Sequence, residues 1–349
     1  MGTPLRLGLA GYGLVGRRHA AAISVTDGVD LSAVIEPDAA ALASAVSEGV
    51  AGYSTLAEAL AAGLDGMILA TPNALHADQA RLCIDAGCPV LIEKPIAVSA
   101  SEAATLVKHA QSRGVPILVG HHRRHNPIIH RARQIIEDGQ IGEIRALQST
   151  CWFYKPDRYF EAAPWRSQPG AGPIAVNLVH DVDLMRHLAG EITSVVAVAR
   201  PSSRGGDNED VASALLEFEN GAVGTITVSD SIVAPWSWEM TSGEYPIYPR
   251  TEESCYLIGG SHGALSLPEL RVWTHRDGVR DWWAPMSASA EIRDNSDPLV
   301  NQIEHFAEVI RGRAAPIVSG AEGARTLEVI EAIQRSGRTN ERVELLRAV

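Results

Sequence analysis

Short runs of large aliphatic residues alternate with helical patterns over the first third of the chain. Helices are expected over residues 17–25, 39–45, 58–62, 76–86 and 101–113. The runs between them are typical of strands buried on both faces, and they lie at Leu5–Ala10, Leu31–Ile35, Gly66–Ala70, Val90–Ile92 and Ile117–Gly120. This alternation predicts an α/β domain with a parallel, doubly wound sheet that ends near residue 122.

After residue 122 the pattern changes to one dominated by strands. Helices are expected at Ile128–Asp138, Val176–Leu188 and Leu299–Arg311. The strand patterns lie at Ile144–Thr150, Val195–Ala199, Ala212–Phe218, Ala222–Ser229, Ser254–Ile258, Ala264–Leu267 and Arg271–His275. Residues 123–349 are therefore expected to form a second, α+β domain with a largely antiparallel sheet.

A glycine-rich loop joins the first expected strand to the first expected helix. In this context a G-x-G-x-x-G pattern indicates a dinucleotide site, because the first glycine permits a tight turn and the second lets the backbone approach a pyrophosphate. The third glycine allows the helix to pack closely on the strand, and the helix N-terminus favours an anion. The expected cofactor-binding residues here are Gly11, Tyr12, Gly13, Leu14, Val15 and Gly16.

Glu36 ends the next strand, 20 residues after Gly16. A carboxylate at this place can accept hydrogen bonds from both hydroxyls of the adenosine ribose, and it repels a 2′-phosphate. Residues 37–50 contain no lysine or arginine to offset that repulsion, although Arg17 and Arg18 follow the glycine loop. The sequence therefore favours NAD over NADP.

Polar residues also follow the third and fourth buried strands. Thr71-Pro72-Asn73 suits a loop at a strand's carboxyl end, and Glu93-Lys94-Pro95 follows Val90–Ile92. Ligands of open α/β sheets collect at these ends, where a lysine can polarise an oxygen or exchange a proton. The alternatives are a helix cap for Asn73 and a solvated turn for Glu93 and Lys94.

The helix expected over Val176–Leu188 is the candidate for active-site chemistry in the second domain. His180, Asp183 and His187 fall on one helix face, and Asn177 precedes His180 by three residues. Such a set can point into a cleft, but it also suits an ordinary polar surface helix.

Net charge, cysteine spacing and the length of apolar runs argue against several classes of protein. The chain has 349 residues and a formal net charge of −12, which argues against nucleic acid or an anionic membrane as a partner. Its four cysteines lack the spacing of a zinc site, and no apolar run is long enough to cross a membrane, so a reduced, cytoplasmic protein is expected. A metal site at His121, His122, His125 and His130 is disfavoured, because neighbouring residues at a strand end face opposite ways.

Aromatic residues are few, yet several gather late in the chain. Trp236-Ser237-Trp238-Glu239, Tyr245, Tyr248 and Trp282-Trp283 suit either the C–H faces of a sugar or cyclitol, or packing in a core or subunit interface. Glu239 and Arg166 could bind hydroxyls. Arg124 and Arg166 could instead bind a carboxylate, or serve as structural ion-pair partners.

Taken together, the motifs resemble those of the Gfo/Idh/MocA family of nicotinamide-dependent oxidoreductases. The resemblance rests on their order and spacing over nearly the whole chain. Its motifs are the glycine loop, Thr71–His76, Glu93-Lys94-Pro95, Gly120–Pro127, Trp165-Arg166, Asn177–Asp183 and a tail that includes Asp297-Pro298-Leu299, His305-Phe306, Pro316 and Ser319-Gly320.

The resemblance implies roles for individual residues. Lys94 would touch the reacting oxygen of the substrate, next to an often cis bond to Pro95, and His180 would share the acid–base work. The implied cofactor contacts, beyond the glycine loop and Glu36, are Thr71, Pro72, Asn73, His76, Glu93, Lys94 and His122. The implied substrate contacts are Lys94, Arg124, Trp165, Arg166, Asn177 and His180. The second domain would be an open-faced sheet that provides a substrate wall and an interface for a homodimer or homotetramer.

One position departs from the family pattern. Many relatives carry an aspartate four residues before the histidine, where this chain has Val176, and Asn177 cannot titrate. The expected function is NAD-dependent hydride transfer at a secondary alcohol of a sugar, cyclitol or related polyol. The alternatives are a dinucleotide-binding sensor that has lost catalysis, and an enzyme acting on a cyclic diol, an imine or a keto group.

Overall fold

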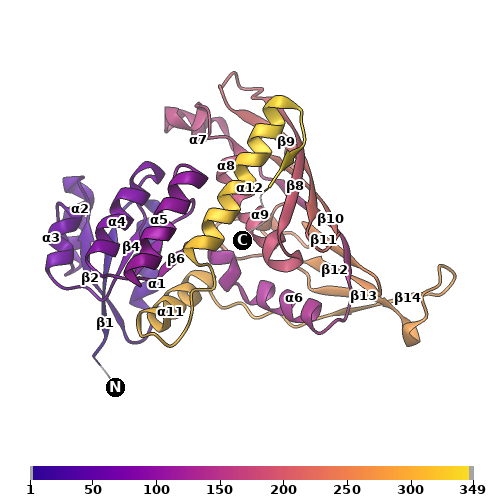
Figure 1. Cartoon of the computed structure of the whole chain (residues 1–349), viewed down its shortest axis with the longest axis horizontal. Coiled ribbons are helices and arrows are strands. Elements are labelled where there is room, and N and C mark those ends of the chain that lie inside the picture. Colours follow the sequence, from indigo (N-terminus) through magenta and orange to yellow (C-terminus); the bar gives the residue numbers. More distant parts are fainter. Residues whose placement is uncertain (1–2, 346–349) are drawn as a thin grey trace. The chain divides into compact units, whose positions relative to one another are not determined.

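The computed structural model describes residues 3–345, which fall into two compact units (Figure 1). The first unit runs up to Asn126 and also includes Ser296–Leu327, while Pro127–Asn295 and the chain from Glu328 onward form the second. The sequence-based division at residue 122 differs, because it assigned Ser296–Leu327 to the second domain. Helix α11 (Pro298–Ile310) packs on α1 (Leu14–Ser24) and buries Ile303 and Phe306 in the first core. A helical pattern alone does not show which sheet the helix covers.

The first unit contains a six-stranded sheet in the order β3-β2-β1-β4-β5-β6, and every strand pair in it is parallel. The predicted parallel, doubly wound sheet is thereby confirmed. Its strands are β1 Leu5–Ala10, β2 Val29–Ile35, β3 Ala51–Tyr53, β4 Gly66–Leu69, β5 Val90–Ile92 and β6 Ile117–Val119. The sequence missed only β3, a three-residue edge strand without a run of large aliphatic side chains.

Helices and short turns connect these strands and place the polar loops at their carboxyl ends. Several helix starts follow from local chemistry, such as the capping box in which Thr55 and Glu58 each bond to the other's backbone N–H. The elements are α1, α2 Ala39–Ser47, α3 Leu56–Ala61, the 3₁₀ turn η1 Asn73–Leu75, α4 His76–Asp85, α5 Ala100–Arg113, the 3₁₀ turn η2 His122–His125, and α11.

The second unit is built on a nine-stranded sheet in the order β14-β13-β12-β11-β7-β10-β9-β8-β15. All neighbouring strands are antiparallel except β10 and β7, which confirms the mostly antiparallel sheet. The strands are β7 Ile144–Trp152, β8 Ile192–Pro201, β9 Glu209–Phe218, β10 Val223–Ser229, β11 Tyr256–Gly260, β12 Gly263–Leu267, β13 Arg271–His275, β14 Met286–Ala290 and β15 Val343–Glu344.

The helices of the second unit include α6 and α9, which pack on each other and on this sheet (Figure 1). The expected helix at Val176–Leu188 is interrupted at Asn177, which separates α8 from α9. The elements are α6 Pro127–Glu137, α7 Asp157–Glu161, the 3₁₀ turn η3 Pro164–Ser167, α8 Pro173–Val176, α9 Leu178–Ala189, α10 Trp238–Thr241, the 3₁₀ turn η4 Arg276–Gly278 and, from Glu328 onward, α12 Gly320–Thr339. Helix α12 was not predicted, although Leu327, Ile330 and Ile333 recur along it at helical spacing.

Candidate active site

The glycine loop after β1 has the geometry that a dinucleotide site requires. Gly11 has a φ of +90°, and a Cβ added there would lie 2.5 Å from the carbonyl oxygen of Ala70. A Cβ on Gly16 would lie 2.0 Å from the carbonyl oxygen of Gly11. Apart from Gly13 itself and its two chain neighbours, no heavy atom of the described residues comes within 4 Å of a Cβ added there, so this position is open to a ligand. The three glycines therefore fit the roles expected for a turn, a close approach to pyrophosphate and helix packing.

The carboxylate of Glu36 is fixed beside this loop by two backbone N–H groups. Tyr12 N donates to Oε2 over 2.8 Å, and Asp38 N donates to Oε1 over 3.0 Å. Each carboxylate oxygen retains a lone pair that can accept a hydrogen bond from a ribose hydroxyl. The loop and Glu36 thus fit NAD.

The side chains in and just after the glycine loop differ in how accessible they are to a cofactor. The side chain of Tyr12 is buried, and its hydroxyl donates to Glu48 Oε2 over 3.0 Å, so only its main chain can meet a cofactor. Leu14 and Val15 are exposed at the start of α1. The guanidinium of Arg17 lies over the Tyr12 ring at 4.6 Å.

His76 joins the two polar loops that follow β4 and β5. Its ring is fully buried, with Nδ1 lying 2.8 Å from the carbonyl oxygen of Pro95 and Nε2 lying 2.9 Å from that of Thr71. The histidine therefore holds these loops together. Pro72 and Asn73 are exposed, and α4 begins without a side-chain cap, so Asn73 does not cap that helix.

Glu93 follows β5 and lies beside His19 on α1 and Gly120 at the end of β6. Its Oε1 lies 2.8 Å from Nε2 of the fully buried His19, and its Oε2 accepts from Lys94 N over 3.2 Å. Burial alone would raise the pKa of Glu93, but the His19 hydrogen bond and the charges of His19, Lys94 and His122 lower that pKa to about 2. A Cβ on Gly120 would lie 3.0 Å from Glu93, so this neighbour must be small.

His19 was not predicted as a site residue, although its place in the sequence offered a signal. His19 stands three residues after Gly16 on the first turns of α1, where a buried polar side chain needs a specific partner. Lys94 itself is half-buried directly after β5, and its bond to Pro95 is cis, as the family resemblance led us to expect.

The histidine- and arginine-rich segment after β6 is largely structural. Arg124 is buried and pairs with Glu322 across 2.9 Å, as the ion-pair alternative expects. The His125 ring lies 5.2 Å from that of His305. Residues 122–125 form a 3₁₀ turn rather than the expected strand end, and no group of described His, Cys, Asp or Glu side chains is arranged to hold a metal ion.

In the second unit, α9 is buried along almost its whole circumference. Every residue from Leu178 to Arg186 is buried, including His180, so the surface-helix alternative is wrong. Several of its polar groups have identified partners: Tyr256 donates to Asp181, and Arg186 pairs with Glu191 across 2.6 Å. His180 N donates to the carbonyl oxygen of Asn177 over 3.1 Å, which fixes the first turn of the helix.

A buried lysine that the sequence analysis missed lies against Asn177. Nζ of Lys155 donates to Asn177 Oδ1 over 2.7 Å and lies 3.7 Å from a carboxylate oxygen of Asp230. Burial lowers the pKa of Lys155, while the charge of Asp230 opposes that shift. The chain has only three lysines among its 30 lysine and arginine residues. This scarcity was the one sequence feature that could have drawn attention to Lys155.

Trp165 and Arg166 lie on η3. Trp165 is exposed, whereas Arg166 donates to the carbonyl oxygen of Tyr159 over 2.6 Å and stacks on the Tyr159 ring at 3.9 Å. The later aromatic residues do not form one group. Trp238 is a core residue that donates to Glu244 over 2.8 Å, while Trp282 and Trp283 are among the most exposed apolar side chains.

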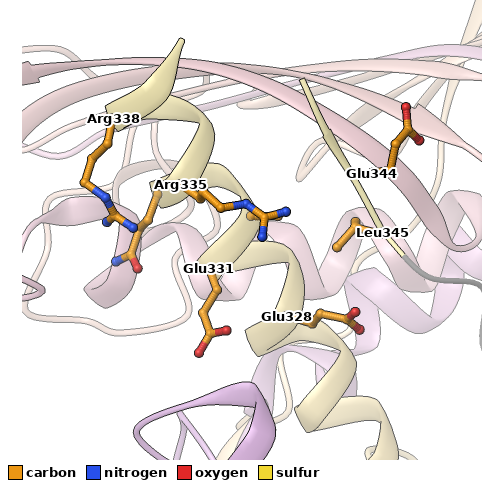
Figure 2. A pocket seen from close by; sticks show the side chains of 8 residues that line it. Glu328, Glu331, Arg335, Arg338, Glu344 and Leu345 are labelled. Carbon is orange, nitrogen blue, oxygen red and sulfur yellow. The ribbon is translucent and has the colours of Figure 1, made fainter. Parts of the chain in front are cut away.

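Figure 2 shows a hollow between α12 and β15 that is lined mainly by charged side chains. None of the residues expected to bind cofactor or substrate lines it. Its lining residues are Glu328, Glu331, Ala332, Gln334, Arg335, Arg338, Glu344 and Leu345.

Comparison with protein families matches both units. Residues 5–121 match the model of an oxidoreductase family with an NAD-binding Rossmann fold, GFO/IDH/MocA, and residues 129–266 match the model of the GFO/IDH/MocA C-terminal domain. The chain belongs to the GFO/IDH/MocA family. It is accordingly an NAD-binding oxidoreductase, an NAD(P)-dependent dehydrogenase acting on CH–OH groups.

Individual members of the GFO/IDH/MocA family match over nearly full length. The rhizopine catabolism protein MocA of Rhizobium meliloti is 30% identical over 95% of this chain and 94% of its own. Inositol 2-dehydrogenase of Rhizobium meliloti is 28% identical over 95% and 96%. The crystal structure of the WlbA dehydrogenase from Bordetella pertussis, in complex with NADH and UDP-GlcNAcA, superposes with a TM-score of 0.78 at 26% identity over 99% of this chain and 100% of that chain. Within residues 3–345, no helix is long and apolar enough to span a bilayer.

Proposed function

We propose that this dehydrogenase oxidises a secondary alcohol of a sugar, cyclitol or related polyol, and reduces the corresponding ketone in the reverse direction. The observation that carries the proposal is the turn after β5, where Glu93 is anchored by His19 and Lys94 follows it at the carboxyl end of the NAD-binding sheet. Similarity to an inositol 2-dehydrogenase and to a dehydrogenase bound to UDP-GlcNAcA supports a carbohydrate or cyclitol substrate.

In the proposed reaction, His180 accepts the proton of the substrate hydroxyl. Lys94 donates a hydrogen bond to the same oxygen and stabilises its developing negative charge. NAD, when bound, supplies the acceptor for the hydride that leaves the alcohol carbon. Val176 replaces the aspartate expected before His180, so Lys94 and His180 divide the acid–base work.

The remaining proposed contacts are those that the family resemblance implies. The main chain of Gly11–Gly16, Glu36 and the loop after β4 would hold the cofactor, and Glu93 and His122 would lie on its nicotinamide side. Trp165, Arg166 and Asn177 would contact the substrate. The exposed Trp165 and the stacked Arg166 offer an aromatic face and a hydrogen-bond donor for a sugar.

We also propose that the enzyme is a cytoplasmic homodimer or homotetramer that assembles through the second unit's sheet. Apolar side chains stand exposed on neighbouring strands of that sheet, with Val196 directly opposite Leu215. Further exposed residues of this kind on the sheet include Val198, Val223, Leu257 and Trp273. All four cysteines are buried thiols rather than disulfides, which suits a reducing compartment.

The experiment that tests the reaction follows NADH absorbance with NAD and a panel of myo-inositol, D-glucose, D-xylose and D-glucuronate. We expect turnover on at least one compound, and we expect Lys94→Ala to lower kcat by about 10³-fold while changing the Kd for NAD by less than about threefold. Lys108→Ala, at an exposed position on α5, is the matched control. If Lys94→Ala weakened NAD binding as much as it lowered kcat, the role of Lys94 would be structural rather than catalytic.

A dinucleotide-binding sensor without catalysis is the second candidate, and Val176 is the observation that favours it. Tight NAD binding with no turnover on any compound would support that candidate. The third candidate is an enzyme that acts on a cyclic diol or reduces an imine. Turnover only with a cyclic diol or only with an imine would support it.

A further inference from the structure

Lys155 is a buried amine with a specific set of partners. It follows β7, its side chain is almost fully buried, and its backbone N–H donates to the carbonyl oxygen of Asp230 over 2.8 Å. The ammonium group lies 2.7 Å from Asn177 Oδ1, 3.7 Å from Asp230 Oδ2 and 5.3 Å from the centre of the Tyr159 ring. These contacts hold the amine against the residue at which α8 meets α9.

The contact with Lys155 determines which way the Asn177 carboxamide faces. An ammonium group has only hydrogen-bond donors, so the carboxamide must turn its oxygen toward Lys155. Its NH₂ group is then directed away from the amine, with two donors to offer. The main chain of Asn177 is fixed as well, because its carbonyl oxygen accepts from His180 N over 3.1 Å.

Folding stability does not account for a lysine at this position. A buried ion pair rarely stabilises a fold more than apolar residues of similar volume would. Asp230 is also shared, because Arg204 Nη1 lies 3.0 Å from its Oδ1. Arg204 also lies 3.6 Å from the exposed Asp157. Asp230 is thus the buried carboxylate that Lys155 and Arg204 share. Glu239 is the further carboxylate whose charge acts on Lys155.

We propose that Lys155 is a positioning residue for the dehydrogenase reaction: it orients the Asn177 carboxamide so that its NH₂ group donates a hydrogen bond to a substrate oxygen beside His180. This inference rests on the proposed function, since it takes His180 as the group that accepts the hydroxyl proton. It also defines a feature of the substrate. The atom that meets Asn177 is a hydrogen-bond acceptor, such as a hydroxyl, ring or carboxylate oxygen next to the reacting carbon.

The proposal explains how the site works without the aspartate that Val176 replaces. A carboxylate at that place would share a proton with the histidine. An oriented carboxamide cannot exchange a proton, but it can hold the substrate oxygen so that the reacting hydroxyl meets His180. Lys155 then acts on the reaction only through Asn177.

A double-mutant cycle tests that dependence directly. The variants are Lys155→Met, which keeps the side-chain length without a donor, Asn177→Leu, and the combination of both. With NAD and the panel compound of highest turnover, we expect each single variant to lower kcat by about 10-fold to 100-fold. We expect the double variant to be no more than about twofold slower than Asn177→Leu, because the two residues act as a unit.

Two further variants separate positioning from folding. Lys155→Arg keeps a cationic donor and should recover at least part of the lost kcat, whereas Lys108→Met changes an exposed lysine and should leave kcat unchanged. The KM for NAD should stay within about twofold in all variants. Independent, multiplicative losses in the double variant would overturn the proposal, and so would equal losses in kcat and NAD binding.

A crystal structure of Lys155→Met provides a readout that does not depend on turnover. We expect the α9 backbone to be unchanged and the Asn177 carboxamide to rotate or to occupy more than one rotamer. An Asn177 side chain that keeps its orientation without Lys155 would overturn the inference even if the enzyme is active. Absence of turnover in the wild type would instead contradict the proposed function.

Discussion

His19 Nε2 lies 2.8 Å from Glu93 Oε1, and this contact links the first helix of the NAD-binding unit to the turn that carries Lys94. The imidazole is fully buried and the carboxylate is largely buried. Oε2 of the same carboxylate accepts from the backbone N–H of Lys94. The position of the lysine therefore depends on a residue that comes 75 positions earlier in the chain.

Removal of His19 should affect both stability and rate. His19→Ala leaves a buried carboxylate without its main partner, which should lower the free energy of unfolding by about 3 kcal/mol. We also expect kcat to fall by about 10-fold, because the turn that holds Lys94 loosens. Urea unfolding and NADH absorbance measure the two effects.

His109→Ala is the matched control for this change. His109 lies 2.8 Å from Asp85, the same separation, but both side chains are partly exposed. Exposed pairs of this kind contribute little, so the control should lose less than about 1 kcal/mol. Similar losses in the two variants would show that the burial of the His19–Glu93 pair is unimportant.

The low pKa of Glu93 makes part of the stability depend on pH. The native-state pKa of about 2 lies below the ordinary value of 4.5, so the unfolded chain binds the proton more tightly. The resulting stabilisation is present above pH 4.5 and is lost as the pH falls toward 2. It should decrease by about 2 kcal/mol between pH 6 and pH 3.

Urea unfolding of the wild type and of Glu93→Gln across this pH range measures that contribution. Glutamine cannot titrate, so the difference in unfolding free energy between the two proteins should shrink as the pH falls. A difference that stays constant from pH 6 to pH 3 would show that the carboxylate is not stabilised in its charged form.

Glu36 should decide the choice between the two nicotinamide cofactors. Glu36→Ala removes the acceptor of the ribose hydroxyls, and we expect it to weaken NAD binding by about 10-fold or more. The Kd for NADP should improve or stay unchanged, because the repulsion of the 2′-phosphate is lost. Calorimetric titration with both cofactors measures the two Kd values and hence the preference for NAD over NADP.

Tyr12→Phe serves as the control for Glu36, because the Tyr12 hydroxyl faces Glu48 rather than the glycine loop. Its Kd for NAD should remain within about twofold of the wild type. A parallel loss of NAD and NADP binding in Glu36→Ala would mean that Glu36 only supports the loop.

The exposed apolar side chains on the nine-stranded sheet of the second unit should determine whether the protein forms a dimer or tetramer. Leu215→Glu places a charge among the exposed apolar side chains of β8 and β9, so we expect a dimer or tetramer to dissociate by at least one step. Light scattering coupled to size-exclusion chromatography gives the mass. Leu82→Glu is the control, since Leu82 on α4 is 49% exposed and Leu215 is 46% exposed. A monomeric wild type, or an unchanged mass in Leu215→Glu, would contradict assembly through this sheet.

Several features could be read from the sequence because their causes are local. The strand–glycine–helix order identified the loop at Gly11–Gly16, since each glycine has a steric reason to be there. Runs of buried aliphatic residues located five of the six strands of the first sheet. Glu36 and Lys94 were found because they directly follow such runs, and the carboxyl ends of parallel strands meet at one edge.

Other features depend on residues that are far apart in the sequence, and only the tertiary structure revealed them. Nothing near His19 indicates that it faces Glu93, and nothing near Lys155 indicates that it bonds to Asn177. Ser296–Leu327 likewise belongs to the first unit because the apolar face of α11 packs in the first core rather than the second. Periodicity defines the apolar face of an element, but the partner of a buried charge is decided when distant segments pack and the charge must be neutralised away from water.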